Sequence, residues 1–361
     1  MSTLSFHPLK VTAVEQVADD AACVTVEIPL ALRDAYTHHA GQYVPVKRMI
    51  EGREERRTYS IVTAPGGGAL KLGIRRQQRG RMSGELVSTL RPGDLLDVGT
   101  PMGRFYTAIS AEREYSYVAF AAGSGITPIL SLAADILARE PRSRFTLVYG
   151  NRSISRTMFL EDTLALKNRY IERFSAHFVM SREPQQTEWL NGRIDGDKVR
   201  ELARHMPEVS TADEYLVCGP GDMVDQVRDA LKALNGNAPI RFERFASGAA
   251  PAETVAREHG VAPASAQILA MISVVMDGRR RTFPMAPDDT SVLTAAERAG
   301  LDLPFSCRSG ICATCRARIT DGAAVMTHNI ALEPWETEAG FVLCCQARPT
   351  TATLDISYDH K

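Results

Sequence analysis

The stretch that decides the fold spans residues 306–315 and reads Ser-Cys-Arg-Ser-Gly-Ile-Cys-Ala-Thr-Cys. Its cysteines, Cys307, Cys312 and Cys315, are spaced Cys-x4-Cys-x2-Cys, and Cys345 follows after 29 intervening residues. This is the plant-type spacing of a [2Fe-2S] site, where three thiolates from one loop and one from elsewhere converge on two irons. The intervening residues are mostly small, so backbone N–H groups can approach the sulfurs. The pattern predicts a [2Fe-2S] domain ligated by these four cysteines.

Two other uses of the cysteines fit the spacing less well. A structural zinc site more usually combines Cys-x2-Cys or Cys/His pairs. A disulfide framework belongs to secreted chains, and neither the amino terminus nor the length indicates secretion. Spacing alone leaves one point open, because Cys344 lies directly beside Cys345 and either could be the fourth ligand.

Length and composition indicate a chain of two or three domains. The 361 residues are 44% hydrophobic and carry a formal net charge of -1. This balance gives no electrostatic case for nucleic acid or an anionic membrane surface as partner. The start, Met-Ser-Thr-Leu-Ser-Phe-His-Pro, lacks a secretory signal, and no run approaches the length of a membrane span. We therefore expect a soluble, cytoplasmic protein.

Short alternating runs punctuated by turns fill residues 11–105 and predict a small antiparallel barrel. Within it, Arg57-Thr58-Tyr59-Ser60 reads as a strand that places Arg57 and Tyr59 on one face. Gly80-Arg81-Met82-Ser83 can open a short helix whose free N–H groups face an anion. Taken alone, each motif is also compatible with an ordinary solvated surface.

From residue 115 apolar strands alternate with helical segments, which predicts a doubly wound α/β nucleotide-binding domain. The first strand leads into Gly123-Ser124-Gly125-Ile126-Thr127-Pro128, a glycine-rich turn that lets the backbone approach a pyrophosphate. Pro128 occupies the third glycine position of the usual dinucleotide fingerprint. Cys218-Gly219-Pro220 ends the fourth strand at the carboxyl edge, where such sheets bind ligands.

Coenzyme choice depends on the loop after the second strand of this sheet. NAD-binding folds usually present Asp or Glu to the ribose there. This chain has Asn151-Arg152-Ser153, with Arg156 nearby. Arginine and serine suit a 2′-phosphate by charge and hydrogen bonding. The loop favours NADPH as coenzyme, with NADH as the alternative.

The remaining sequence predicts a tether and a third, α+β domain. Residues 246–267 are rich in Ala, Gly, Pro and Ser without a sustained apolar period. A hairpin turning at Asp277-Gly278 and a helix near 291–299 precede the cysteine loop. The predicted division is an antiparallel barrel (1–107), a nucleotide-binding domain (108–246), a linker (247–267) and a [2Fe-2S] domain (268–361).

Three motifs of the barrel resemble the ferredoxin-NADP reductase family in order and spacing, and so does the Gly-x-Gly-x-Thr-Pro turn. The three motifs are Arg57-Thr58-Tyr59-Ser60, Gly80-x-x-Ser83 and Pro101-Met102-Gly103-Arg104-Phe105. The C-terminal part resembles a plant-type ferredoxin, which implies a β-grasp fold. In ferredoxin-type sequences the ligand directly precedes a run such as Gln-Ala-Arg-Pro-Thr, so the resemblance assigns Cys345 as ligand and places Cys344 in the core.

The resemblance implies FAD as the flavin. Arg57 would bind a flavin phosphate, Tyr59 would pack against the isoalloxazine, Ser60 would hydrogen-bond near its reactive nitrogen, and residues 80–83 would cradle the pyrophosphate. Cys218 would lie beside the nicotinamide, with Glu243 and Phe245 in the segment that returns to the flavin. The implied catalytic residues are Ser60, Cys218 and Glu243, and the implied cofactor contacts are Arg57, Thr58, Tyr59, Ser60, Gly80, Arg81, Met82, Ser83, Gly123, Ser124, Gly125, Thr127, Arg152, Ser153, Arg156, Cys218, Gly219, Pro220 and Phe245.

Three domains in this order imply an electron-transfer chain from NADPH through FAD to a [2Fe-2S] cluster. The chain has no di-iron Glu-x-x-His pattern of its own, so the cluster needs an outside acceptor. The resemblance implies a reductase component that serves a di-iron oxygenase. A Rieske-type aromatic-ring or steroid-hydroxylating oxygenase is the alternative acceptor, and a non-catalytic redox sensor or regulatory subunit is a different class of function.

Overall fold

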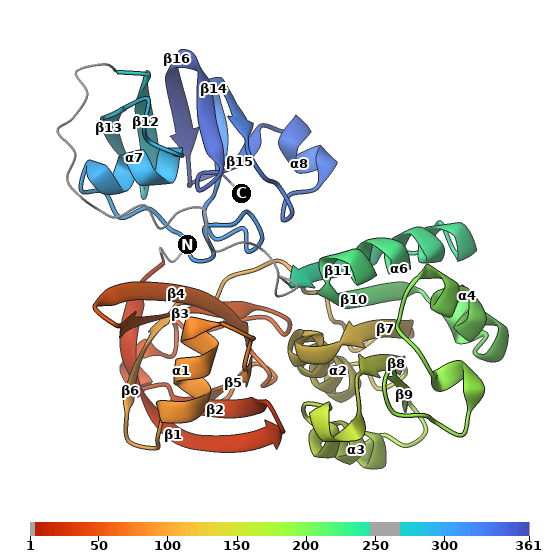
Figure 1. Ribbon diagram of the computed structural model, residues 1–361. Coiled ribbons are helices and arrows are strands. Elements are labelled where there is room, and N and C mark those ends of the chain that lie inside the picture. The colour runs from red at the N-terminus through yellow and green to blue at the C-terminus, as the bar shows by residue number, and fades with distance from the viewer. Residues whose placement is uncertain (1–3, 246–267, 361) are drawn as a thin grey trace. The chain divides into compact units, whose positions relative to one another are not determined.

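The computed structural model describes residues 4–245 and 268–360 (Figure 1). These residues form two compact units, 4–245 and 268–360. The predicted linker, 247–267, lies outside the described residues, and the domain boundaries remain a prediction.

An antiparallel barrel begins the first unit. Its strands are β1 (Phe6–Ala18), β2 (Ala21–Glu27), β3 (Tyr43–Ile50), β4 (Arg53–Ser60), β5 (Ala69–Arg75) and β6 (Leu95–Gly99). They are ordered β4-β3-β6-β1-β2-β5, and a bridge between Ile61 and Leu72 joins the two ends of the sheet. The short η1 (Leu30–Leu32) follows β2, and α1 (Arg81–Thr89) follows β5. The predicted barrel is confirmed, although its first strand begins at Phe6, earlier than the expected start near residue 11.

The second part of this unit is a parallel sheet covered by helices on both faces. Its strands are β7 (Ser116–Ala122), β8 (Arg144–Asn151), β9 (Phe174–Met180), β10 (Glu214–Pro220) and β11 (Ile240–Phe245). The helical segments are η2 (Gly123–Gly125), α2 (Ile126–Arg139), η3 (Ile154–Arg156), α3 (Leu160–Arg169), η4 (Glu188–Leu190), α4 (Gly196–His205), α5 (Glu208–Thr211) and α6 (Gly221–Leu234). Separate apolar cores lie under α2 and under α4 to α6, which confirms the doubly wound fold.

Strand order in this sheet is β11-β10-β7-β8-β9. The chain runs outward from β7 to β9 and then returns to β10 on the other side of β7. The switch point of the sheet therefore lies between β7 and β10, and ligands of such folds bind in the crevice at the carboxyl ends of these strands. The turn Gly123–Gly125 and the end of β10 at Pro220 both lie at this edge.

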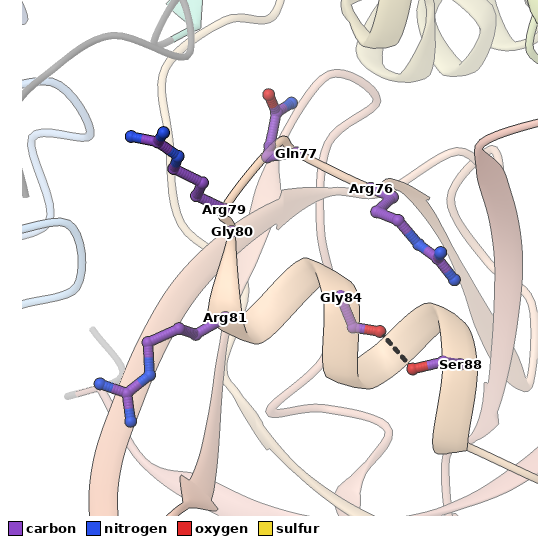
Figure 2. A pocket seen from close by; sticks show the side chains of 7 residues that line it. All are labelled: Arg76, Gln77, Arg79, Gly80, Arg81, Gly84 and Ser88. Atoms are coloured by element: carbon purple, nitrogen blue, oxygen red, sulfur yellow. Dashed lines mark hydrogen bonds between the residues drawn. The ribbon is translucent and has the colours of Figure 1, made fainter.

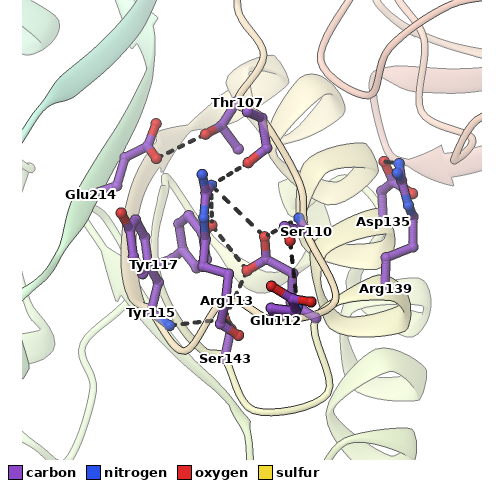
Figure 3. A network of polar contacts seen from close by, with 12 residues as sticks. Thr107, Ser110, Glu112, Arg113, Tyr115, Tyr117, Asp135, Arg139, Ser143 and Glu214 are labelled. Carbon is purple, nitrogen blue, oxygen red and sulfur yellow. Dashed lines mark hydrogen bonds and ion pairs between the residues drawn. The ribbon is translucent and has the colours of Figure 1, made fainter.

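Two buried glutamates tie the segment after the barrel to the nucleotide-binding sheet (Figure 3). Glu140, which is fully buried, accepts hydrogen bonds from the Ser110 N–H of the connecting segment (3.1 Å) and from the Tyr117 hydroxyl of β7 (3.0 Å). The Thr107 hydroxyl donates to Glu214 at 2.8 Å. Because a buried carboxylate without partners is costly, these bonds fix the connecting segment in place.

The second unit is a mixed sheet with one main helix packed on it. Its strands are β12 (Ala270–Met276), β13 (Arg279–Met285), β14 (Arg316–Met326), β15 (Phe341–Leu343) and β16 (Ala347–Ser357). Its helices are α7 (Val292–Arg298) and α8 (Pro334–Glu338). The order is β13-β12-β16-β14-β15, with β12 and β16 parallel. This is the expected α+β fold.

The residues at the β12–β13 turn and at the two ends of α7 explain the predicted hairpin and helix of this unit. Asp277 and Gly278 turn the β12–β13 hairpin with φ angles of 53° and 69°, as a two-residue turn of this kind requires. Ser291 caps α7 by accepting a hydrogen bond from the Thr294 N–H at 3.2 Å. Gly300 ends the helical region with a φ of 75°.

Candidate functional site

The cysteine loop folds so that backbone N–H groups point at a sulfur. The N–H groups of Ser309 and Cys312 both donate to the Sγ of Cys307 at 3.4 Å. This geometry needs left-handed backbone at Arg308, Gly310 and Ala313, whose φ angles are 55°, 75° and 53°. Left-handed non-glycine residues are uncommon and gather at functional sites. The loop is therefore arranged to stabilise negative charge on its thiolates.

The four predicted ligands come together as two pairs. Cys307 and Cys312 share a hydrogen bond that lowers the pKa of Cys307 to about 5 and raises the pKa of Cys312. Cys315 and Cys345 share another, which lowers the pKa of Cys345 and raises the pKa of Cys315. Within the described ranges, no three Cys, His, Asp or Glu side chains surround a single point. Two pairs suit two irons better than one tetrahedral ion, so the residues fit a [2Fe-2S] cluster.

Cys344 and Cys345 face different surroundings. Cys345 reaches Cys315, and the Gln346 amide lies 3.7 Å from its sulfur. Cys344 is fully buried in the core, and burial raises its pKa to about 12. Its side-chain hydrogen-bond partner is the Tyr358 hydroxyl and not another cysteine. The geometry supports the choice of Cys345, which remains a proposal.

The predicted flavin motif lies on β4 of the barrel. Ser60 is buried, Thr58 and Tyr59 are half-buried, and Arg57 is exposed. The Tyr59 ring packs on the barrel core, yet its hydroxyl is buried without a hydrogen-bond partner. Arg57 forms an ion pair with Glu55 at 3.1 Å. An orphaned phenol next to an accessible guanidinium fits a bound flavin with a phosphate tail.

A basic pocket surrounds the start of α1 (Figure 2). It is lined by Arg76, Gln77, Arg79, Gly80, Arg81, Gly84 and Ser88. The first-turn N–H groups of a helix have no partner within the helix and attract anions. Of the predicted cradle residues, Met82 is buried in the barrel core. The Ser83 hydroxyl accepts from the Gln77 N–H at 3.0 Å, so these two residues can offer a pyrophosphate their backbone rather than free side chains.

The glycine-rich turn requires its glycine at position 125. A Cβ on Gly125 would lie 2.2 Å from the carbonyl oxygen of Cys218. The Thr127 hydroxyl donates to the Ser124 carbonyl at 2.8 Å and fixes the turn. Gly123 adopts a left-handed φ of 56°. The predicted turn residues and the end of β10 thus meet at the switch point, where the fold binds a dinucleotide.

Cys218 and Glu243 are directly opposite each other on β10 and β11. Cys218 is fully buried, and burial, with a smaller effect of Glu243, raises its pKa. Burial also raises the pKa of Glu243 to about 8, and its Oε2 has no hydrogen-bond partner. A neutral carboxyl with an unused oxygen can bind an amide such as the nicotinamide carboxamide. Phe245 pairs with Pro220 at the end of β11.

Of the two arginines in the predicted coenzyme loop, Arg156 is ion-paired with a residue of the barrel, whereas Arg152, among the described residues, is not. Arg152 is exposed, and no ion pair is recorded for it in the described part of the chain. Arg156 instead forms an ion pair with Asp20 of the barrel. Sequence reasoning missed Arg182, whose N–H donates to the Arg152 carbonyl at 2.9 Å. The positive charge of Arg182 is the largest cause of the lowered pKa of Arg152. Two adjacent positive charges form a site for an anion.

Family models match all three parts of the chain. Residues 8–106 match an oxidoreductase FAD-binding domain, 120–229 an oxidoreductase NAD-binding domain, and 274–350 a 2Fe-2S iron-sulfur cluster binding domain. With the sites described above, they define an NAD(P)H oxidoreductase that contains FAD and a [2Fe-2S] cluster. The chain belongs to the family of ferredoxin-NADP reductase-type flavoproteins with a C-terminal ferredoxin domain.

Among its relatives is a subunit of the 1,2-phenylacetyl-CoA epoxidase of Escherichia coli (strain K12). The two are 38% identical over 358 residues, which cover 99% of each chain. The ferredoxin reductase component of 3-ketosteroid-9-alpha-monooxygenase from Rhodococcus rhodochrous is 28% identical over 97% of this chain and 96% of that protein.

Solved structures show the same fold. Phthalate dioxygenase reductase, described as a modular structure for electron transfer from pyridine nucleotides to [2Fe-2S], aligns over 98% of both chains with a TM-score of 0.58 and 22% identity.

In the ranges that the structure describes, no helix has the length and apolar character needed to cross a membrane.

Proposed function

We propose that the chain is the reductase component of a di-iron phenylacetyl-CoA epoxidase and passes electrons from NADPH, by way of FAD and a [2Fe-2S] cluster, to the oxygenase component. The observation that carries this proposal is the 38% identity with the E. coli epoxidase protein over 99% of both chains. We place the protein in the cytoplasm, where its thiolate ligands stay reduced.

When bound, FAD and the cluster convert the two-electron transfer from the nicotinamide into transfers of single electrons. The chain's own side chains bind and orient the reactants. Arg57 and the N-terminus of α1 hold flavin phosphates, and the backbone of 123–125 receives the coenzyme pyrophosphate. Glu243 is half-buried with its Oε2 shielded from solvent, and burial raises its pKa to about 8, so that it can donate a hydrogen bond at the nicotinamide end. Cys218 closes that end of the site against water because it is fully buried.

NADPH is the proposed coenzyme because Arg152 and Arg182 lie together and no ion pair is recorded for either in the described residues. Ser153 adds a hydroxyl on the same loop. Replacing either arginine with alanine should raise the KM for NADPH by about tenfold and change the KM for NADH little. Arg193→Ala, an exposed arginine after β9, is the matched control. Equal catalytic efficiency of the wild-type protein with NADPH and NADH would contradict the proposal.

A Rieske-type steroid hydroxylase is the second candidate acceptor, favoured by the 28% identity with the Rhodococcus reductase component. The test supplies purified holo-protein and NADPH to each oxygenase in turn. We expect NADPH oxidation coupled to epoxidation of phenylacetyl-CoA, and no coupled turnover of a 3-ketosteroid by its monooxygenase. The reverse pattern would favour the second candidate, and failure to reduce dyes with NADPH would favour a redox sensor.

A further inference from the structure

A turn of the flavin barrel holds the coenzyme loop of the neighbouring domain. Asp20, between β1 and β2, forms an ion pair with Arg156 in η3, and its other oxygen lies 3.8 Å from the Nε of Arg75. The Asp20 and Arg75 side chains are only 16% and 14% exposed, and that of Arg156 is 34% exposed. The contact is therefore screened by solvent less than an ordinary surface ion pair.

Backbone hydrogen bonds seat the loop independently of the Asp20 carboxylate. The Asp19 N–H donates to the Ser155 carbonyl at 3.0 Å. The Arg75 guanidinium donates to the Arg156 carbonyl at 2.5 Å, and the Arg76 N–H donates to the Asp20 carbonyl at 2.8 Å. Removing the charge of Asp20 while keeping its size should thus leave the loop in place and release the Arg156 side chain.

The Asp20 charge acts within a basic region. The pKa of Arg152 is lowered first by Arg182, then by burial, Arg156 and Arg75, whereas Asp20 acts in the opposite direction. All of these groups therefore act on the arginine proposed to meet the 2′-phosphate. A single negative charge at this place weakens the attraction for a phosphate dianion more than for the uncharged ribose hydroxyl of NADH.

We propose that Asp20 is a specificity-determining positioning residue: it holds Arg156 away from the coenzyme, offsets its charge, and so limits discrimination in favour of a 2′-phosphate. The proposal rests on NADPH as the proposed coenzyme. It places part of the control of coenzyme choice in the flavin domain, on a residue 136 positions away in the sequence from the arginine it holds.

The test uses the full-length holo-protein and two probes, adenosine 2′,5′-bisphosphate and adenosine 5′-monophosphate, whose Kd values are measured by isothermal titration calorimetry. In Asp20→Asn, the preference for the bisphosphate should increase by about three- to tenfold. Arg156→Gln in that background should abolish the increase, while Arg156→Gln alone, which leaves the Asp20 charge without its Arg156 partner, should lower the preference. Asp20→Glu should keep the wild-type preference, and Asp19→Asn, at an exposed neighbour, is the control.

Steady-state kinetics with ferricyanide give a second readout, because Asp20→Asn should lower the KM for NADPH and leave kcat unchanged. An equal loss of affinity for both probes in Asp20→Asn would show that Asp20 has only a structural role. An unchanged preference for the bisphosphate over the monophosphate would also overturn the proposal. The wild-type preference separately tests NADPH as coenzyme. A wild-type protein without preference would refute that coenzyme, while the change between variants would still decide the role of Asp20.

Discussion

Gly125 and Cys218 approach so closely that any side chain at position 125 would collide with the backbone of β10, since a Cβ there would lie 2.2 Å from the Cys218 carbonyl oxygen. Gly125→Ala should therefore push the glycine-rich turn away from β10. We expect a loss of stability of about 1–3 kcal/mol and at least tenfold weaker binding of NADP+, with FAD retained. Thermal unfolding and calorimetric titration measure the two effects.

Gly221→Ala is the matched control for this prediction. A Cβ at Gly221 would make only an ordinary 3.8 Å contact with the Arg244 side chain. It should leave stability and coenzyme affinity close to wild type. Wild-type coenzyme affinity in Gly125→Ala would mean that the turn does not hold the pyrophosphate.

Cys312→Ser removes one member of the Cys307–Cys312 pair, so iron content and the visible cluster bands should be lost while FAD remains. Reduction of cytochrome c through the cluster should fall by at least about tenfold, and ferricyanide reduction by the flavin should be retained. Equal loss of both activities would argue against a linear chain.

Cys344→Ser distinguishes the two adjacent cysteines. Because the buried Cys344 thiol has the Tyr358 hydroxyl as its side-chain hydrogen-bond partner, whereas Cys345 pairs with Cys315, replacement of Cys344 should keep the cluster spectrum and cost some stability. Loss of the spectrum would show that Cys344, and not Cys345, is the ligand.

Arg57→Ala should yield protein depleted in FAD, with affinity weakened by about tenfold or more, because a charge-assisted contact to a phosphate is lost. Fluorescence of released FAD measures the occupancy. Arg53→Ala, at the other end of the same strand, should retain the flavin. Full occupancy in Arg57→Ala would make Arg57 an ordinary partner of Glu55.

Glu243 should make folding stability depend on pH. Burial raises its pKa from 4.5 to about 8, so between these values the folded chain keeps a proton that the unfolded chain has released. Stability should therefore fall as pH rises through this window. Glu243→Gln should raise the Tm little at pH 5 and most at pH 9. Glu27→Gln, at an exposed strand position, is the control, and a pH-independent difference would contradict a protonated Glu243.

Local sequence was enough to predict the parts of the sites that depend on one loop. The cysteine spacing, the Gly123–Gly125 turn and the Asp277-Gly278 hairpin each encode their own backbone geometry. The three fold classes followed from the change of apolar period along the chain. The fold classes are confirmed, and the backbone of these loops agrees with the expected turns because little outside each segment is needed to form them; the roles of the site residues stay predictions.

Contacts between distant segments could not be predicted in this way. Arg182 reaches Arg152 only because β8 and β9 continue their pairing beyond the strand ends. Arg156 was assigned to the coenzyme by its place in the loop, yet Asp20 holds it from another domain. Sequence spacing carries no information about such partners, because tertiary folding alone brings them together.

The order of electron transfer is tested most directly by stopped-flow absorbance of the holo-protein mixed anaerobically with NADPH. We predict bleaching of the flavin bands first and loss of the cluster bands afterwards. Flavin bleaching without any change at the cluster would show that the ferredoxin domain is not reduced from within the chain, and would contradict the proposed reductase function.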